Sequence, residues 1–192
     1  SFDTILSTVS SSTQRLLVYN NNKEGLRINE VRLKKASASP FRVNVDGEFL
    51  QGGTGYDFEV RGNDSIFVLL EATLPEANVD TIITYSDSLC FLLESGEMQY
   101  VTLLADGQDA LHWRGVTVVD NDTTFKSKRP IIIYDSLYVS PGVTLQIEAG
   151  TNLYFHQHAS MCVDGTIKVN GTLEKPVVFR GDRMDNLFDY LP

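Results

Sequence analysis

Pairs of apolar residues two positions apart recur along the C-terminal part of the chain and constrain its fold more than any other feature. The pairs are Leu137/Val139, Leu145/Ile147, Leu153/Phe155, Met161/Val163, Ile167/Val169 and Val177/Phe179. Successive pairs lie 8, 8, 8, 6 and 10 residues apart, so that three steps add up to 24, 22 and 24 residues. That period is typical of one coil of a three-sided, right-handed parallel β-helix, whose coils stack their inward residues on one another. A second sandwich with very short hairpins is the alternative, and the near-constant spacing favours the β-helix.

The preceding part of the chain has a different pattern, one of short β-strands closed by turn residues. Strand-type segments occupy residues 15–20, 26–33, 41–47, 56–62, 64–72, 81–87, 89–96 and 99–107. In the second of these segments, between Leu26 and Leu33, the alternation of apolar and polar residues slips by one position after Ile28. Many short strands with turn signals every 8–12 residues are typical of an antiparallel β-sandwich. The sequence therefore predicts an all-β chain with an immunoglobulin-like sandwich over 1–110 and the first β-helix coils over 111–192.

Charge and cysteine content exclude several classes of protein. The chain carries 16 Lys and Arg against 25 Asp and Glu, a net charge of −9, and an acidic surface repels phosphate backbones, so we expect no nucleic-acid partner. No apolar run approaches the roughly 18–20 residues that span a bilayer. Cys90 and Cys162 lack the spacing of a disulfide framework or of a CxxC motif. Each lies among apolar residues, where a free cysteine usually packs as a small hydrophobic side chain.

The histidines of the segment LYFHQHASMC (153–162) are the candidate metal ligands. Zinc needs three or four converging ligands at about 2.0–2.3 Å. Phe155 belongs to the inward pattern, so His156 is expected to point outward, and no acidic residue follows before Asp164. We therefore expect His156 and His158 to be exposed corner residues, and a metal site there is the minor alternative. No cofactor is expected, and no nucleophile motif such as Gly-x-Ser-x-Gly is present.

The segment GDRMDNLFDY (181–190) holds the best local group of charged and aromatic residues. Its candidate binding residues are Asp182, Arg183, Asp185 and Tyr190. β-Helix polysaccharide lyases and hydrolases use acids and a basic residue in a groove along several stacked coils, and this chain has about three coils. A solvated turn that leads into the next coil is therefore the preferred interpretation of the cluster.

Both halves of the chain resemble one family. VSPGVTLQIEAGTNLYFHQHASMCVDGTIKVNGTLEKPVVFRGDR resembles the opening coils of right-handed β-helix surface proteins of Bacteroides-type bacteria. FDTILSTVSSSTQRLLVYN, SPFRVNVDG, DSIFVLLEA and LLADGQDA resemble the sandwich that precedes the helix in those proteins. The resemblance implies an exported lipoprotein, attached to the outer membrane through an N-terminal lipid and displayed at the cell surface. It also implies further coils beyond Pro192. It supplies no catalytic residues.

A short motif recurs more often than chance predicts. Asp followed by Ser or Thr and then by Ala, Ile, Leu, Met, Thr or Val occurs six times, against roughly one expected from composition. This resembles the O-glycosylation acceptor motif of exported proteins in that phylum. The implied acceptors are Thr4, Ser65, Thr81, Ser88, Thr123 and Ser136. Alternatively, the motif is a turn that leads into a strand.

These features together predict a function in display rather than catalysis. We expect a non-enzymatic surface protein that binds a polysaccharide, a host glycan or another host ligand, with the sandwich as spacer and as cap over the unpaired strand edges of the β-helix. A polysaccharide-active enzyme with its active site in coils beyond residue 192 is the alternative. A purely structural stalk is the third possibility.

Overall fold

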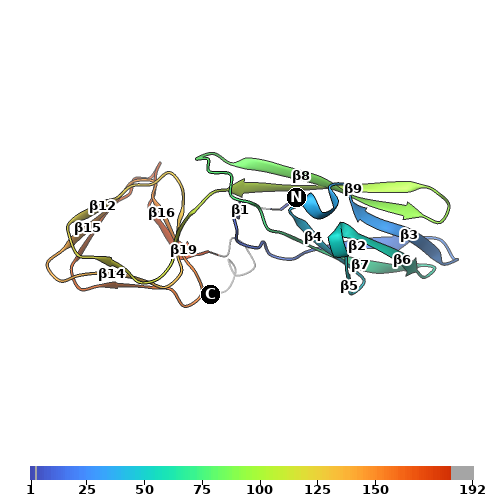
Figure 1. Cartoon of the computed structure of the whole chain (residues 1–192), viewed down its shortest axis with the longest axis horizontal. Helices are drawn as coiled ribbons and strands as arrows, with labels where there is room; N and C mark the ends of the chain where they lie inside the picture. The colour runs from blue at the N-terminus through green and yellow to red at the C-terminus, as the bar shows by residue number, and fades with distance from the viewer. Residues whose placement is uncertain (3, 183–192) are drawn as a thin grey trace. The chain divides into compact units, whose positions relative to one another are not determined.

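The computed structural model describes residues 1–2 and 4–182 (Figure 1). Apart from the 3-10 turns Ala36–Ala38 and Gln51–Gly53, the regular elements of this part of the chain are β-strands. The chain divides into two compact units. The sandwich unit comprises Ser1–Glu76 and Ile83–Gly107, and the solenoid unit comprises Ala77–Ile82 and residues 108–182.

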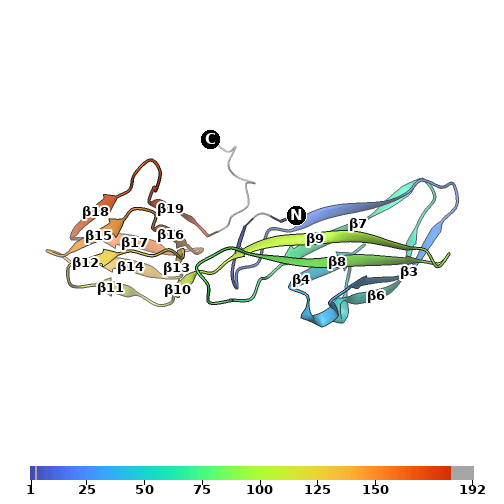
Figure 2. The same cartoon turned by 90° about the horizontal axis from the view of Figure 1, so that it is seen from above.

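The sandwich unit consists of two sheets. The five-stranded sheet has the order β1 (Ile5–Leu6), β9 (Met98–Gln108), β8 (Ile83–Leu93), β3 (Leu26–Leu33) and β6 (Thr54–Val60). The four-stranded sheet has the order β2 (Gln14–Asn20), β7 (Asp64–Ala72), β4 (Phe41–Val45) and β5 (Glu48–Phe49). Neighbouring strands from β2 to β9 pair antiparallel, and Figure 2 shows β8 and β9 side by side. The predicted antiparallel sandwich is confirmed.

Alternate residues of both sheets form one hydrophobic core. Val31 and Phe91 come from the first sheet, Val45 and Val68 from the second, and all four are buried in the same cluster. This alternation follows from strand geometry, in which successive side chains point to opposite faces. The slip predicted after Ile28 is a register irregularity between Ile28 and Glu30 in the pairing of β3 with β8. A bulge of this kind returns the apolar residues to the core face.

One strand prediction in the sandwich is wrong. Residues 81–87 and 89–96 were expected as two strands, and the structure has the single strand β8 over Ile83–Leu93. The polar residues at its centre suggested a turn, but Asp87 is buried, and its Oδ1 accepts hydrogen bonds from the backbone N–H groups of Ser88 (2.7 Å) and Lys35 (3.2 Å). The carboxylate is therefore accommodated within the strand. Its other oxygen, Oδ2, is buried without a partner among the described residues.

The solenoid unit has three parallel sheets, one for each side of the coil. The first contains β10 (Leu111–Trp113), β13 (Ile131–Ile133), β16 (Asn152–Phe155) and β19 (Val178–Gly181). The second contains β11 (Thr117–Val119), β14 (Ser136–Val139) and β17 (Ser160–Val163). The third contains β12 (Thr123–Phe125), β15 (Thr144–Glu148) and β18 (Thr166–Asn170). Strands of successive coils pair in parallel throughout, which confirms the predicted β-helix coils.

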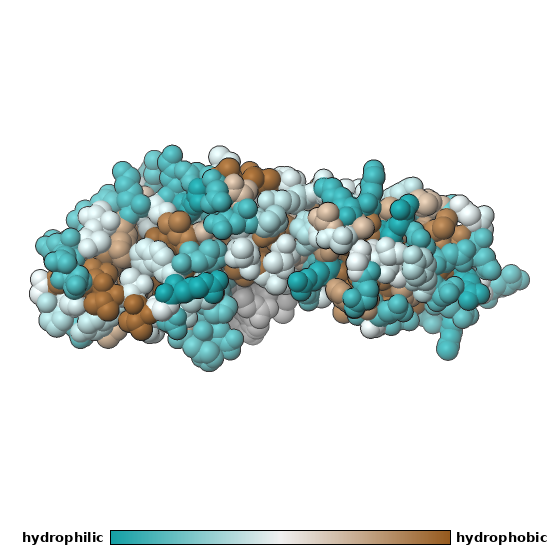
Figure 3. Space-filling view, in the orientation of Figure 1, coloured by the Kyte–Doolittle hydropathy of each residue, from teal (hydrophilic) through white to brown (hydrophobic). Residues whose placement is uncertain are grey.

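The inward pairs predicted from the sequence form the core of the solenoid. Those of the middle coils are buried: Leu137, Val139, Leu145, Ile147 and Leu153 are fully inaccessible to solvent. The same positions in the last coil are more exposed, because no described strand stacks on it. Figure 3 shows hydrophobic residues interspersed with hydrophilic ones on the visible face of the chain.

The predicted register of the last side needs a correction. The spacing paired Leu153 with Val177, whereas in the structure Leu153 pairs with Phe179 and Phe155 with Gly181. The connection before β19 is two residues longer than the regular repeat allows, and Val177 lies in it while still packing against the core. Gly165 lies at a corner where the backbone passes close to the preceding coil. A Cβ there would clash with the carbonyl oxygens of Ser140 and Val143, so glycine is required.

The cysteine predictions are half correct. Cys90 is buried, and burial raises the pKa of its thiol. Cys162 is exposed, so the expectation that it packs as a hydrophobic residue is wrong. It lies on the outward face of β17, between two inward residues, as the alternation of the strand requires. None of the described residues forms a helix that is long and apolar enough to cross a membrane.

Candidate functional site

Four side chains from successive coils stack at one corner of the solenoid, and we call them the corner ladder: Arg114, Tyr134, His156 and Asp182. Each follows the last residue of β10, β13, β16 or β19. The parallel hydrogen bonding continues through the corner, because the N–H groups of Tyr134, His156 and Asp182 donate to carbonyls of the coil below at 2.9–3.0 Å. The regular backbone thus places one ladder residue above another at the spacing of neighbouring strands, about 4.8 Å.

The Arg114 end of the ladder is a cation–aromatic stack. The Arg114 guanidinium carbon lies 4.2 Å from the centre of the Tyr134 ring, a contact worth about 0.5–1 kcal/mol at an exposed site. The rings of Tyr134 and His156 follow with their centres 4.8 Å apart. His112, on the outward face of β10, places its Nδ1 3.0 Å from the Tyr134 hydroxyl oxygen in a hydrogen bond. Both faces of the tyrosine ring are therefore covered, and its hydroxyl is held in place.

The Asp182 end of the ladder is a carboxylate–imidazole pair. Nδ1 of His156 lies 2.6 Å from Oδ2 of Asp182. Because a carboxylate accepts a hydrogen bond, the N–H at Nδ1 is the donor of this bond. The Asp182 side chain is almost completely buried, whereas nearly half of the His156 side chain is exposed. The pair therefore presents an oriented imidazole to solvent.

The electrostatics of the ladder keep the tyrosine neutral. Burial raises the pKa of Tyr134 above its ordinary value, Asp182 adds to the rise, and Arg114 opposes it. The corner presents the Arg114 guanidinium, the Tyr134 phenol and the His156 ring in sequence. Such groups donate and accept hydrogen bonds at fixed spacing, which is the chemistry of binding a hydroxyl- or oxyanion-rich ligand.

The two predicted metal-candidate histidines occupy one turn. His156 and His158 are both exposed, as expected for corner residues. His158 has a positive φ of 70°, and the N–H of Ala159 donates to the carbonyl of His156 at 2.8 Å to close the turn. Nδ1 of His156 is already bonded to Asp182. Within residues 1–2 and 4–182, no three metal-binding side chains come together.

The ladder contains one residue of the predicted acidic cluster, Asp182. The others, Arg183, Asp185 and Tyr190, lie outside the described residues. His112, Arg114 and Tyr134 are not among the site residues predicted from the sequence. Arg114 and Tyr134 each follow the last residue of a strand at the same point of the coil, whereas His112 lies within β10. Their contacts become evident only once the register of the coils is known.

The predicted glycosylation acceptors lie before or within strands. Thr81 is exposed and the other five hydroxyl residues are partly buried: Thr4, Ser65, Ser88, Thr123 and Ser136. The aspartates of these motifs often have a structural role. Asp64 accepts from the N–H of Ser65, Asp122 from that of Thr144, and Asp135 from that of Gly115, all at 2.7 Å. These bonds are what the turn interpretation expects. Two of the acceptor hydroxyls are themselves hydrogen-bonded, because Thr123 donates to the Asn121 carbonyl (2.7 Å) and the Ser136 hydroxyl bonds to that of Ser160 (3.1 Å).

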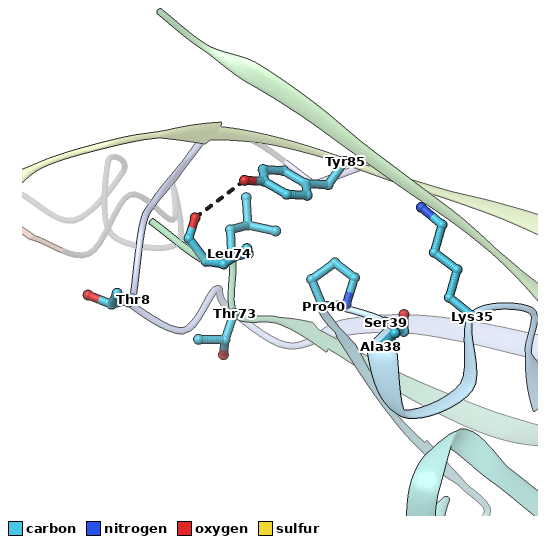
Figure 4. Close-up of a pocket in the computed structure, with 9 residues that line it drawn as sticks. Thr8, Lys35, Ala38, Ser39, Pro40, Thr73, Leu74 and Tyr85 are labelled. Atoms are coloured by element: carbon cyan, nitrogen blue, oxygen red, sulfur yellow. Dashed lines mark hydrogen bonds between the residues drawn. The ribbon is translucent and has the colours of Figure 1, made fainter. Parts of the chain in front are cut away.

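The sandwich unit has a separate cleft of about 470 Å3 (Figure 4). Lys35, Pro40, Leu74 and Tyr85 are among the residues that line it. Two of its polar groups are already engaged, because Tyr85 donates its hydroxyl to the Pro75 carbonyl (3.3 Å) and Lys35 Nζ donates to the Ser86 carbonyl (2.6 Å). The remaining lining is mainly apolar, so the cleft has fewer groups to offer a polar ligand than the corner ladder has.

Comparisons with known proteins give no family. The chain matches no family model and no curated protein. Among solved structures, it is similar to a family 123 glycoside hydrolase from Clostridium perfringens, with 8% identity, a TM-score of 0.36, and 58% of this chain and 25% of that chain covered. It is also similar to the E. coli chaperone DraB, with 13% identity, a TM-score of 0.33, and 55% of this chain and 51% of that chain covered. The chain thus spans a quarter and about half of these two structures.

Proposed function

We propose that this chain belongs to an exported, non-enzymatic surface protein of the Bacteroides type that binds glycans through the outer surface of its solenoid. The observation that carries the proposal is the corner ladder, which repeats polar, planar side chains once per coil. A solenoid offers equivalent positions at a fixed spacing, so its natural ligand is one that also repeats, as a polysaccharide does.

The geometry of the ladder supports hydrogen bonding rather than stacking with the sugar. Arg114 and His156 cover the two faces of the Tyr134 ring, so the ring cannot serve as a platform for a pyranose. The exposed groups of the ladder are instead the guanidinium N–H groups of Arg114 and the ring of His156, which can form hydrogen bonds with sugar hydroxyls. Hydrogen bonds that involve charged groups contribute about 1.5–3 kcal/mol each.

The cellular setting is part of the proposal. The resemblance of the chain to Bacteroides-type surface proteins and its six acceptor-like motifs support export and attachment to the outer membrane through an N-terminal lipid. The sandwich serves as spacer and cap for the solenoid. Protease treatment of intact cells that produce the full-length protein tests the location: loss of the protein supports surface display, and protection contradicts it.

A glycan array tests binding, and matched variants test the site. Tyr134→Phe and Arg114→Gln are expected to weaken binding by about tenfold each, which corresponds to 1.4 kcal/mol. The control is Tyr138→Phe, which removes a hydroxyl that donates to Asp164 (2.6 Å) on another side of the solenoid. Equal effects of Tyr134→Phe and Tyr138→Phe on binding would show that the glycan binds elsewhere on the protein. An array on which no glycan is bound would contradict the proposal and favour a purely structural stalk.

The His156–Asp182 pair favours a second candidate function, that of a polysaccharide-active enzyme. A carboxylate that orients an imidazole is the arrangement of many general bases. Incubation of the protein with acidic and neutral polysaccharides, followed by an assay for new reducing ends, separates the two functions. We expect no release of reducing ends. If reducing ends are released and the His156→Gln variant releases none, the protein is an enzyme and the proposal of a non-enzymatic binding function is wrong.

A further inference from the structure

A groove runs along one side of the sandwich unit, between an edge of each sheet. Its two connected parts have volumes of about 420 and 190 Å3. Both parts are bordered by β2 and by β9, and they share Leu16 and Val101. The buried core residues Ile28 and Phe91 contribute to the lining. The groove therefore gives access to the hydrophobic core between the sheets.

Both strands that border the groove have a free edge within the described part of the chain. β2 pairs with β7 alone, at the end of its sheet. β9 pairs with β8 along its length, and its other neighbour, β1, is only two residues long. The N–H of Phe2 donates to the carbonyl of Leu104 (2.8 Å), and from that point toward Met98 no described strand lies beside β9. Unpaired strand edges are templates for another strand.

We propose that this groove accepts an extended polypeptide strand, which pairs with the free edge of β9 over Met98–Thr102. The added strand continues the row that β1 begins, and so extends the five-stranded sheet. Its backbone satisfies the unpaired N–H and C=O groups of β9. Its inward side chains enter the groove beside Leu16 and Val101, which is the pattern of β-strand addition.

The lining of the groove defines the chemistry of the strand. Apolar residues at alternate positions fit the groove, because Val18, Leu26 and Leu93 are among its lining residues. The far end carries Glu97 and the polar run Asn20–Asn22. The partner is therefore an alternating apolar and polar segment with a basic end that lies near Glu97. A wholly apolar segment would leave its outward face exposed to water.

Hydrogen exchange of the unmodified protein tests the proposal directly. The probe is a synthetic peptide of four Thr-Val repeats with a lysine at each end, and the control peptide has proline in place of each valine, which removes the backbone donors. We expect the probe to slow amide exchange in residues 98–102 and the control peptide to have no effect. Protection of β6, the opposite edge of the same sheet, or of the last coil (β17–β19), or no protection at all, would overturn the proposal.

Matched variants give a second test. Val101→Glu places a charge in the groove and is expected to weaken binding of the probe at least tenfold, measured by fluorescence anisotropy of the labelled peptide. Tyr56→Glu introduces the same charge at an exposed position of β6 and is expected to leave the affinity unchanged. Equal affinities of the two variants contradict the assignment. If circular dichroism shows that Val101→Glu is unfolded, the proposal is judged on the hydrogen-exchange pattern of the unmodified protein alone.

Discussion

A valine-to-alanine substitution can be compared at Val139 and Val163, which lie in successive coils and pair with each other in the second sheet of the solenoid. Val139 is 0% exposed and lies between Val119 of the coil below and Val163 of the coil above. Val163 is 36% exposed because no described strand covers it. Val139→Ala removes two buried methyl groups, a transfer loss of about 1.6 kcal/mol at 0.8 kcal/mol each. The cavity left behind raises the total loss of stability to about 2.5 kcal/mol.

Val163→Ala is expected to cost about 1 kcal/mol or less, because much of its surface is in water in both states and the site can relax. Urea denaturation followed by fluorescence measures both values. Trp113 is the single tryptophan of the chain and packs edge-on against Phe125, with ring centres 4.9 Å apart in the solenoid. Val118→Ala, on the exposed outer face, is the control and should stay within about 0.5 kcal/mol. Equal losses for Val139→Ala and Val163→Ala would refute the reasoning and show that the last coil is covered in solution.

Three further predictions concern single groups. Asp109→Ala should destabilise the solenoid by about 2–3 kcal/mol in the same urea assay, because the buried carboxylate accepts hydrogen bonds from the N–H groups of Ala77 and Val79; an unchanged midpoint would contradict this role. Burial raises the pKa of Tyr154, so the folded state holds the phenol proton more tightly than the unfolded state does. Its contribution to stability is complete below the unfolded pKa, near 10, and is lost as pH rises through the folded pKa, so Tyr154→Phe should flatten the alkaline limb of stability against pH. Intact mass of the protein from its native host should show O-glycans, and Thr81→Ala should remove one of them; a mass equal to that of the bare chain would exclude glycosylation.

The solenoid could be predicted closely because its core depends on spacing alone. Apolar residues two apart, such as Leu137 and Val139, define the inward face, and the interval to the next pair defines the coil. The wrong register at Val177 arises because the prediction used spacing alone. A connection can take up two extra residues without altering the apolar pattern, so the sequence does not reveal whether Val177 or Phe179 enters the sheet.

The corner ladder was less accessible to prediction because it depends on contacts between coils. The exposure of His156 followed from the alternation around Phe155, but its bond to Asp182 requires the register of the following coil. Alternation likewise gives the faces of a strand and not its neighbours. The inward residues of β2 and β9 could be identified from the sequence, whereas the groove between the two edges depends on the order of strands in the sheets. Asp87 shows the remaining limit, since a polar residue in mid-strand resembles a turn until its hydrogen bonds are known.

The solenoid unit is discontinuous in the chain, since Ala77–Ile82 belongs to it although β8 and β9 follow in the sandwich unit. Within the described residues, the polypeptide therefore passes from one unit to the other after Glu76, Ile82 and Gly107. A recombination event at any one of these junctions would separate Asp109 from the backbone amides of Ala77 and Val79 or leave a sandwich without β8 and β9. A gene segment that keeps the Asp109 contacts of the solenoid intact must therefore also encode β8 and β9 of the sandwich, because they lie between the two parts of the solenoid unit in the chain.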